Sequence, residues 1–206
     1  MSAQRLTPQH VLDAYKMGIF PMADSATSHD LHWYRPPLRA LLPVDHFHVP
    51  TRLRRWMKHT TLRVTFDQAF AEVIRACGTR TATRRETWIN AEIIHLFTQL
   101  HVMGHAHSVE VWRGDALVGG LYGLHLGAAF FGESMFSRET NASKLALVRL
   151  VEHLQRQNFT LLDAQFSNPH LTQFGLYEIS QENYEKQLQN ALMVERKFMS
   201  FMGLGA

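Results

Sequence analysis

The stretch that decides the fold runs from residue 107 to residue 136 and reads HSVEVWRGDALVGGLYGLHLGAAFFGESMF. Apolar and polar residues alternate over 109–112, which is the period of a half-buried strand. Turn-forming residues at 113–115 and at 125–127 separate this strand from two further apolar runs. The stretch therefore predicts an antiparallel meander of three strands. The adjacent glycines at 119–120 indicate a bulge or a close approach of two backbones.

Helical patterns lie on both sides of this meander. Thr7 is suited to an N-cap, Pro8 to the first turn, and Gly18 to the residue that ends the first helix. Similar signals, with Asp67 and Asn90 as N-caps, predict helices over 50–59, 67–78, 90–104, 141–155 and 180–192, and strands over 62–66 and 160–166. The order predicts an α+β (mixed α/β) fold on a largely antiparallel sheet. We expect a small N-terminal domain over 1–40 and the main domain over 41–206.

Composition limits the classes of protein to consider. The 206 residues are 46% hydrophobic and 19% charged, as in a globular chain and unlike a disordered or collagen-like one. No apolar run approaches the roughly 18 residues that a membrane span needs, and the first residues do not resemble a secretory signal. The single Cys77 excludes a disulfide framework. We expect a cytoplasmic protein without a membrane partner.

Positive charge is concentrated in one segment. Residues 35–85 hold 11 Lys and Arg against 3 Asp and Glu, although the whole chain has a net charge of only +3. The basic cluster consists of Arg52, Arg54, Arg55, Lys58 and Arg63. On the predicted helix over 50–59, positions 54 and 58 lie one turn apart, so the cluster forms a cationic strip beside an aromatic residue. Such a strip is often only a solvated helix face, but it also fits contact with the phosphates of a nucleic acid.

Two acidic residues interrupt apolar strands and are candidates for chemistry. Asp163 and Gln165 are two positions apart in the predicted strand over 160–166, so both side chains point to one face. Burying an acid and an amide is costly unless both are satisfied, which favours a functional role. Glu133 is the one carboxylate in its strand, and exposure to solvent is the simpler explanation there.

Metal and hydrolase chemistry have little support in the sequence. Thirteen histidines are present, and His101, His105 and His107 are close together, but no His-Glu-x-x-His or Cys/His spacing occurs. Gly-x-Ser-x-Gly and Walker motifs are absent too. Cys77 falls on the apolar face of a predicted helix, as buried inert thiols do. We expect no metal and no cofactor.

Taken together, several motifs resemble those of the bacterial leucyl/phenylalanyl-tRNA–protein transferases. They span roughly residues 10–180 in the order of that family. They read AYKMGIFPM at 14–22, TWI at 87–89, GHAHSVEVW at 104–112, LVGGLYG at 117–123, FFGESMFS at 130–137, NASK at 141–144 and LDAQ at 162–165.

The resemblance implies a fold and an activity. The main domain would be similar to the acetyltransferase (GNAT-like) fold. The enzyme would move Leu or Phe, and less readily Met, from its tRNA to the N-terminal Arg or Lys of a protein, forming a peptide bond and marking that protein for degradation. The family uses no known cofactor, and we expect a monomer.

The resemblance also implies site residues. Asp163 and Gln165 match the catalytic pair, in which the aspartate polarises the glutamine and the glutamine carbonyl receives the amine proton; in a rival version the tRNA ribose hydroxyl shuttles the proton. Arg55 and Lys58 match tRNA-binding positions, with Arg52 in place of a basic residue at 51. The residues matching the binding site for the aminoacyl-adenosine end are Met22, Trp88, Leu121, Phe130, Glu133, Leu147, Leu150, Leu162 and Asn168.

Within that set, the matches imply different contacts. Trp88 would stack on the terminal adenine, with Met22 where many relatives carry a second Trp. The leucines and Phe130 would line the side-chain pocket, in which Leu150 replaces an aromatic residue of some relatives. Glu133 and Asn168 would make polar contacts beside it.

Two other functions compete with this reading. A coenzyme-A-dependent N-acetyltransferase would need a glycine-rich turn before its long helix, but residues 137–143 contain no glycine. A non-catalytic RNA-binding module would use only the cationic strip and leave Asp163 and Gln165 idle. The Leu-versus-Phe preference, the acceptor proteins and the role of residues 197–203 are not readable from the sequence.

Overall fold

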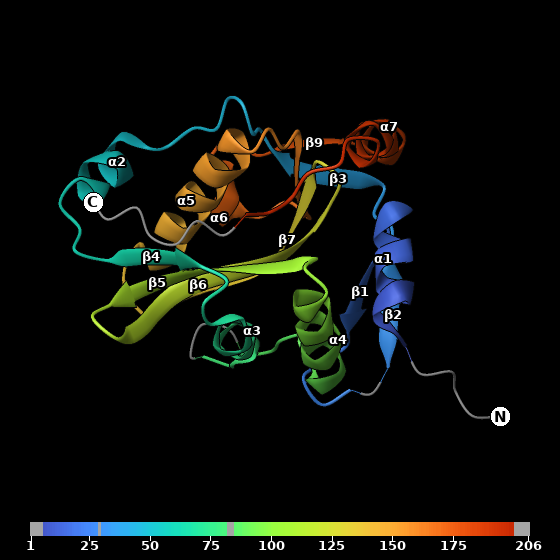
Figure 1. Ribbon diagram of the computed structural model, residues 1–206, viewed down its shortest axis with the longest axis horizontal. Helices are drawn as coiled ribbons and strands as arrows, with labels where there is room; N and C mark the ends of the chain where they lie inside the picture. Colours follow the sequence, from blue (N-terminus) through green and yellow to red (C-terminus); the bar gives the residue numbers. More distant parts are fainter. Residues whose placement is uncertain (1–5, 29, 82–84, 200–206) are drawn as a thin grey trace.

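The computed structural model describes residues 6–28, 30–81 and 85–199, and Figure 1 shows their arrangement. The elements in chain order are α1 (Pro8–Lys16), β1 (Phe20–Ala23), β2 (Leu31–Tyr34), β3 (Leu38–Leu42), α2 (Thr51–Met57), β4 (Arg63–Phe66), α3 (Phe70–Gly78), α4 (Ala91–Val102), β5 (Ala106–Arg113), β6 (Ala116–Leu126), β7 (Ala129–Ser137), α5 (Ala142–Arg156), β8 (Leu161–Gln165), α6 (Pro169–Thr172), β9 (Tyr177–Ser180) and α7 (Gln181–Leu192).

The N-terminal segment folds as its capping residues predict. The Thr7 hydroxyl accepts a hydrogen bond from the backbone N–H of His10, whose ring in turn accepts from the N–H of Thr7, so both ends of a capping box are present. Gly18 follows the helix with a φ of +73°, a left-handed conformation that favours glycine. β1 and β2 then form an antiparallel hairpin.

One seven-stranded sheet carries the rest of the chain, in the order β4-β5-β6-β7-β8-β3-β9. All neighbouring pairs are antiparallel except β7 and β8, which are parallel because α5 crosses over between them. The predicted meander corresponds to β5, β6 and β7. The predicted α+β fold on a largely antiparallel sheet is confirmed.

Helices cover both faces of this sheet (Figure 1). The side chains of α1, α3, α4 and α7 contribute to one apolar core, and those of α2 and α5 contribute to a second. Cys77 of α3 is buried in the first core. Among the described residues, no helix combines the length and the apolar character that crossing a membrane would require.

The paired glycines of β6 allow the long helix to approach the sheet. A Cβ added to Gly119 would lie 2.5 Å from the Cβ of Ala142, at the start of α5, and one added to Gly120 would lie 2.6 Å from the carbonyl oxygen of Val109. The register of β5 against β6 shifts next to this point, between Val111 and Trp112. The predicted close approach is confirmed, and a strand irregularity accompanies it.

The N-cap predicted for α3 is wrong. The helix begins at Phe70 with Ala69 at its N-cap position, and Asp67 lies in the preceding turn with a φ of +57°. The Asp67 carboxylate instead accepts from the backbone N–H of Ser108 at 2.9 Å and lies 2.8 Å from Nδ1 of His107. Partners on β5 therefore compete successfully with the helix end for this side chain. Asn90 does cap α4, by accepting from the N–H of Ile93.

The C-terminal segment returns to the second core. Phe198 is buried with its ring stacked on His107 at 4.1 Å between centroids and close to His153 at 4.4 Å. The part of the stretch 197–203 that lies within the described residues thus contacts the core, and residues 200–203 lie outside them.

Candidate active site

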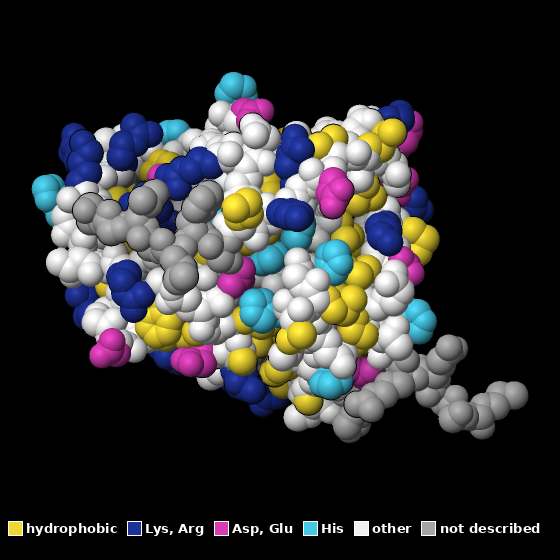
Figure 2. Space-filling view, viewed as in Figure 1, with side chains coloured by type: hydrophobic (Ala, Val, Ile, Leu, Met, Phe, Trp, Pro, Cys, Tyr) yellow, Lys and Arg dark blue, Asp and Glu magenta, His cyan; other side chains and the backbone are white. Residues whose placement is uncertain are grey.

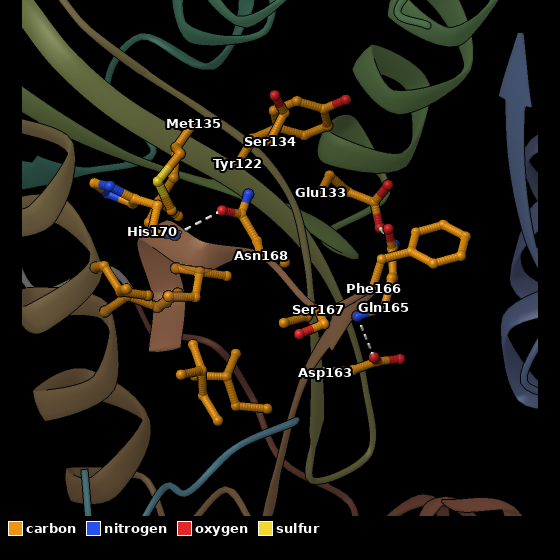
Figure 3. A pocket seen from close by; sticks show the side chains of 18 of the residues that line it. Tyr122, Glu133, Ser134, Met135, Asp163, Gln165, Phe166, Ser167, Asn168 and His170 are labelled. Carbon is orange, nitrogen blue, oxygen red and sulfur yellow. Dashed lines mark hydrogen bonds between the residues drawn. The ribbon is translucent and has the colours of Figure 1, made fainter. Parts of the chain in front are cut away.

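A cavity of about 320 Å³ lies where β6, β7, β8 and α5 meet the N-terminal hairpin. Most of the predicted binding residues line it, as Figure 3 shows for part of the set. Its walls are Met22, Leu42, Trp88, Leu121, Tyr122, Gly132, Glu133, Ser134, Met135, Leu147, Leu150, Leu162, Asp163, Ala164, Gln165, Phe166, Ser167, Asn168, His170 and Leu171. The volume suits an aliphatic or benzyl group with part of a nucleoside.

The walls divide into apolar and polar parts. Leu121, Leu147, Leu150 and Leu162 are buried and come from β6, α5 and β8, whose apolar faces pack on one another. The carboxyl of Glu133 and the amide of Gln165 lie next to each other on one side of the view in Figure 3, away from Met135 and His170. An apolar hole with few polar groups at one side is the usual form of a small-molecule site.

Asp163 is completely buried and is held by four donors. The guanidinium of Arg39 donates to it from Nε, at 3.0 Å to each oxygen, and from Nη2 at 2.6 Å. The hydroxyl of Tyr184 donates at 2.7 Å, and the backbone N–H of Gln165 donates at 2.7 Å. The carboxylate is therefore engaged by protein groups on all sides. Its contact with Gln165 runs through the backbone, whereas polarising the glutamine would need the side-chain amide.

Gln165 is where the strand changes direction. Its φ is +65°, in the left-handed region that glutamine rarely adopts. The pairing of β3 with β8 shifts here, because Ala40 faces Gln165 while the next residue, Leu41, faces Asp163. This irregularity turns the side chain of Gln165 toward Glu133, and its Nε2 donates to Glu133 Oε1 at 2.9 Å.

Glu133 is the second acidic group of the site. Tyr15 from α1 donates to its Oε1 at 2.7 Å, while its Oε2 is buried and has no hydrogen-bond partner among the described residues. Burial raises the pKa of Glu133 to about 8, although the hydrogen bond from Tyr15 opposes the shift. Burial and the nearby Glu133 raise the pKa of Tyr15 well above its usual value. At neutral pH this carboxyl is therefore largely protonated.

The structure brings almost all the predicted binding residues to the cavity, with one exception. Phe130 is not part of the described cavity wall: it is fully buried in the second core, beside Gly123 and 5.6 Å from the ring of Phe198. Phe130 lies in the regular part of β7, whereas Glu133 is the extra residue of an irregularity, because Tyr122 pairs with Ser134 while the next residue, Gly123, pairs with Gly132. Asn168 lines the cavity, but its side chain also caps α6 by accepting from the N–H of His170.

The basic strip lies on the exposed face of α2. Arg52, Arg55 and Lys58 are all exposed, while Leu53 anchors the helix in the second core. Figure 2 shows Lys and Arg side chains gathered at the end of the molecule where α2 lies. None of the three lines the described cavity. Arg39 falls within the basic segment 35–85, but it is buried and takes no part in this surface.

The histidines noted in the sequence do not form a metal centre. Within residues 6–28, 30–81 and 85–199, no three His, Cys, Asp or Glu side chains are grouped so that they could hold an ion. His101 and His107 both approach Asp67, and His107 Nε2 lies 2.8 Å from Nδ1 of His125. The imidazoles of His107 and His125 form a separate buried cluster with Phe198.

Several residues of the site were missed from the sequence. Arg39, Tyr15 and Tyr184 hold the two acids but come from β3, α1 and α7, far from them along the chain. Only Arg39 gives a local signal, as the one charge in the apolar strand Leu38–Leu42. Tyr122, Ser134, His170 and Leu171 add to the cavity wall.

Comparison with known proteins agrees with this geometry. A family model described as leucyl/phenylalanyl-tRNA protein transferase matches residues 41–189, and the model of that protein's N-terminal domain matches residues 4–37. A protein of Hyphomonas neptunium is 53% identical over 198 residues, covering 96% of this chain and 76% of its own length. One of Paramagnetospirillum magneticum is 54% identical over 187 residues, covering 91% and 90%. Both are named leucyl/phenylalanyl-tRNA–protein transferase. The chain belongs to the leucyl/phenylalanyl-tRNA–protein transferase family.

Proposed function

We propose that this protein is an aminoacyltransferase that moves an aminoacyl group from aminoacyl-tRNA to the N-terminal α-amino group of an acceptor protein. The observation that carries the proposal is the contact between Gln165 and Glu133 beside an apolar cavity, in a member of this family. We propose Leu and Phe as the groups transferred, with Met less readily, and Arg or Lys as the acceptor residue.

The main tasks of the enzyme are to align the acceptor amine with the ester carbonyl and to give the amine proton a route away. The acceptor amine attacks the ester carbonyl, the new C–N bond forms, and the bond to the ribose oxygen breaks; the proton that the amine loses ends on this leaving oxygen. Gln165 donates to Glu133 through Nε2, so its amide oxygen is left to accept a hydrogen bond from the attacking amine. This orients the nitrogen lone pair toward the carbonyl. In the rival version, the ribose hydroxyl of the tRNA carries the proton from the amine to the leaving oxygen.

The donor end would bind in the cavity. Leu121, Leu147, Leu150 and Leu162 would surround the aliphatic or benzyl side chain, and Trp88 would stack on the terminal adenine with Met22 beside it. A methylene in an apolar pocket contributes only about 1–3 kcal/mol of discrimination, so several apolar residues should be accepted. Glu133 and Asn168 supply polar contacts at the wall.

The body of the tRNA would contact α2. Arg52, Arg55 and Lys58 present positive charge to its phosphates, and such contacts carry no sequence information. Different tRNA bodies should therefore bind alike. We further propose that the protein acts as a monomer in the cytoplasm, where the modified acceptors are degraded.

We also propose two domains, 1–40 and 41–206. The two family models, which match 4–37 and 41–189, support a division in this region. β3 runs across the boundary and joins the hairpin to the sheet.

A transfer assay tests the function. Leu-tRNA, Phe-tRNA and Val-tRNA labelled in the amino acid would be incubated with peptides that begin with Arg, Lys or Ala. Labelled product is expected with the first two tRNAs on the Arg and Lys peptides. Equal product on the Ala peptide would refute the acceptor rule, and no product with any peptide would refute the transferase.

Two controls separate the alternatives. Replacing Arg52, Arg55 and Lys58 together by Gln should weaken tRNA binding while transfer recovers at high tRNA concentration; tRNA binding without any transfer by the unaltered protein would indicate an RNA-binding module. Acetyl-CoA would be titrated into the protein in a calorimeter, and heat of binding would indicate an acetyltransferase.

A further inference from the structure

A complete ion pair is buried between the neighbouring strands β3 and β8, and its Asp163 belongs to the cavity wall. Arg39 of β3 and Asp163 of β8 are both 0% exposed. Besides its three bonds to Asp163, Arg39 donates from Nη1 to the carbonyl of Gly18 at 2.9 Å. Its guanidinium lies over the rings of Phe20 and Tyr184, at 4.7 and 4.3 Å from their centroids. Burial is the largest single influence and would lower the pKa of Arg39, but the charge and the hydrogen bonds of Asp163, with smaller contributions from Tyr184 and Tyr15, together raise it.

Stability alone does not explain why an ion pair is buried at this position. The desolvation of two charges generally offsets their attraction, and well-packed apolar residues of similar size are often as stable. Here the geometry indicates the reason, because Asp163 also accepts from the backbone N–H of Gln165, two residues further along the chain. This is the bond of an Asx-turn, which lets a side chain hold its own backbone in a tight turn.

The turn determines where Gln165 points. A left-handed backbone costs a non-glycine residue free energy, so a φ of +65° persists only where neighbouring contacts hold it. The Asp163 bond is one such contact, and a bond from the N–H of Phe166 to the carbonyl of Ala164 is another. In this conformation Gln165 reaches Glu133 at the cavity.

We propose that Arg39 is a positioning residue for aminoacyl transfer. Together with Tyr184 it fixes the Asp163 carboxylate, which holds the turn at Gln165 and so aims the amide at Glu133 and the reacting groups. Asp163 acts through the backbone of Gln165 and does not accept the proton of the amine. This inference rests on the proposed function and adds to it the way in which the amide is oriented.

A charge-neutral exchange tests the proposal. Asp163→Asn leaves the charge of Arg39 buried without a partner, so its melting temperature and its single-turnover transfer should both fall sharply. In the double variant Arg39→Met with Asp163→Asn, no charge is left, and the asparagine oxygen still accepts from the N–H of Gln165. The double variant should regain transfer to within about tenfold of the unaltered enzyme, with an unchanged Kd for aminoacyl-tRNA.

A different result for the double variant would contradict the proposal. If the double variant melts like the unaltered protein but transfers no faster than Asp163→Asn, the carboxylate charge itself is needed and the proposal is overturned. Arg35→Gln is the matched control, because it removes an Arg–Glu185 pair at the surface that also joins the N-terminal segment to α7. It should change neither transfer nor stability.

A second measurement is independent of transfer. Hydrogen exchange of the Gln165 backbone amide, followed by NMR, should be faster in Tyr184→Phe, which removes one donor to Asp163 and leaves the ion pair intact. The same variant should lower kcat and leave the KM for tRNA unchanged. Unchanged exchange and unchanged kcat would overturn the proposal. If the unaltered enzyme transfers nothing, the proposed function fails, and amide exchange still tests the turn.

Discussion

Two of the buried polar clusters among the described residues lie against the sheet and differ in charge and in access. The cavity cluster consists of Arg39, Asp163, Tyr184, Gln165, Glu133 and Tyr15. The histidine cluster consists of Asp67, His107, His125, His153 and the ring of Phe198. The first cluster includes a complete ion pair, a left-handed glutamine and part of a cavity wall. The second consists mainly of stacked rings, and none of its members lines that cavity.

The protonation states of the two clusters also differ. Burial lowers the pKa of His125 and of His153 to about 4, with nearby positive groups adding to the effect, so both rings are neutral at pH 7. In the cavity cluster the buried ion pair persists beside a carboxyl whose pKa is raised to about 8. Burial of polar groups alone therefore does not mark a site. Paired charge, a strained backbone and an adjoining cavity together do.

The variant Gln165→Gly should distinguish the functions of the two clusters most strongly. It removes the amide from the cavity cluster, and glycine adopts the φ of +65° without strain. Single-turnover transfer should fall about 100-fold, as when one polar group that stabilises a transition state is lost. The free energy of unfolding, measured by urea denaturation, should change by less than about 1 kcal/mol. A rate within threefold of the unaltered enzyme would remove Gln165 from the mechanism.

Phe198→Ala is the reverse experiment in the histidine cluster. It empties the space between His107 and His153, and the loss of a buried aromatic ring should lower the free energy of unfolding by about 3 kcal/mol. Transfer at 20 °C should be unchanged, because the ring does not line the described cavity. Equal loss of transfer and stability would show that the clusters are coupled.

Rising pH should destabilise the protein through the cavity cluster. Because the pKa of Glu133 is raised to about 8 in the folded protein, the folded state binds a proton that the unfolded state has lost between about pH 4.5 and 8. The contribution of this group to stability therefore falls as pH rises through that window, by at most on the order of 5 kcal/mol. Glu133→Gln should abolish this slope in urea denaturation; an unchanged slope would contradict the raised pKa.

Acid should act on the histidine cluster, with a smaller effect for each group. The lowered pKa of His153 means that the unfolded state binds the proton first, so stability present above pH 6.5 is lost as pH falls toward 4. His153→Phe should reduce the loss between pH 6.5 and 4.5 by about 1–2 kcal/mol, measured by denaturation at both values. Asn141→Gly, in the left-handed cap of α5, is a control that should leave the pH slope unchanged.

Much of the fold was predictable because local patterns record it. The alternation over 109–112 and the turn residues at 113–115 predict β5 and its turn, and Thr7 and Asn90 predict the starts of α1 and α4. The same reasoning failed at Asp67, where β5 offers donors that no helical pattern indicates. The family resemblance, and no local pattern, implied that Phe130 lines the pocket, whereas the structure places this residue in the second core beside Phe198.

The sequence by itself determined the α+β class, the family and the acid and amide that the reaction is proposed to need, because periodicity and motif order are local properties of the chain. Only the tertiary structure decided what those side chains touch. Arg39 lies 124 positions from Asp163, and Tyr15 lies 118 from Glu133, so each contact depends on the order of strands in the sheet. The direction of Gln165 depends on a turn that those distant partners stabilise, and no local pattern contains that information.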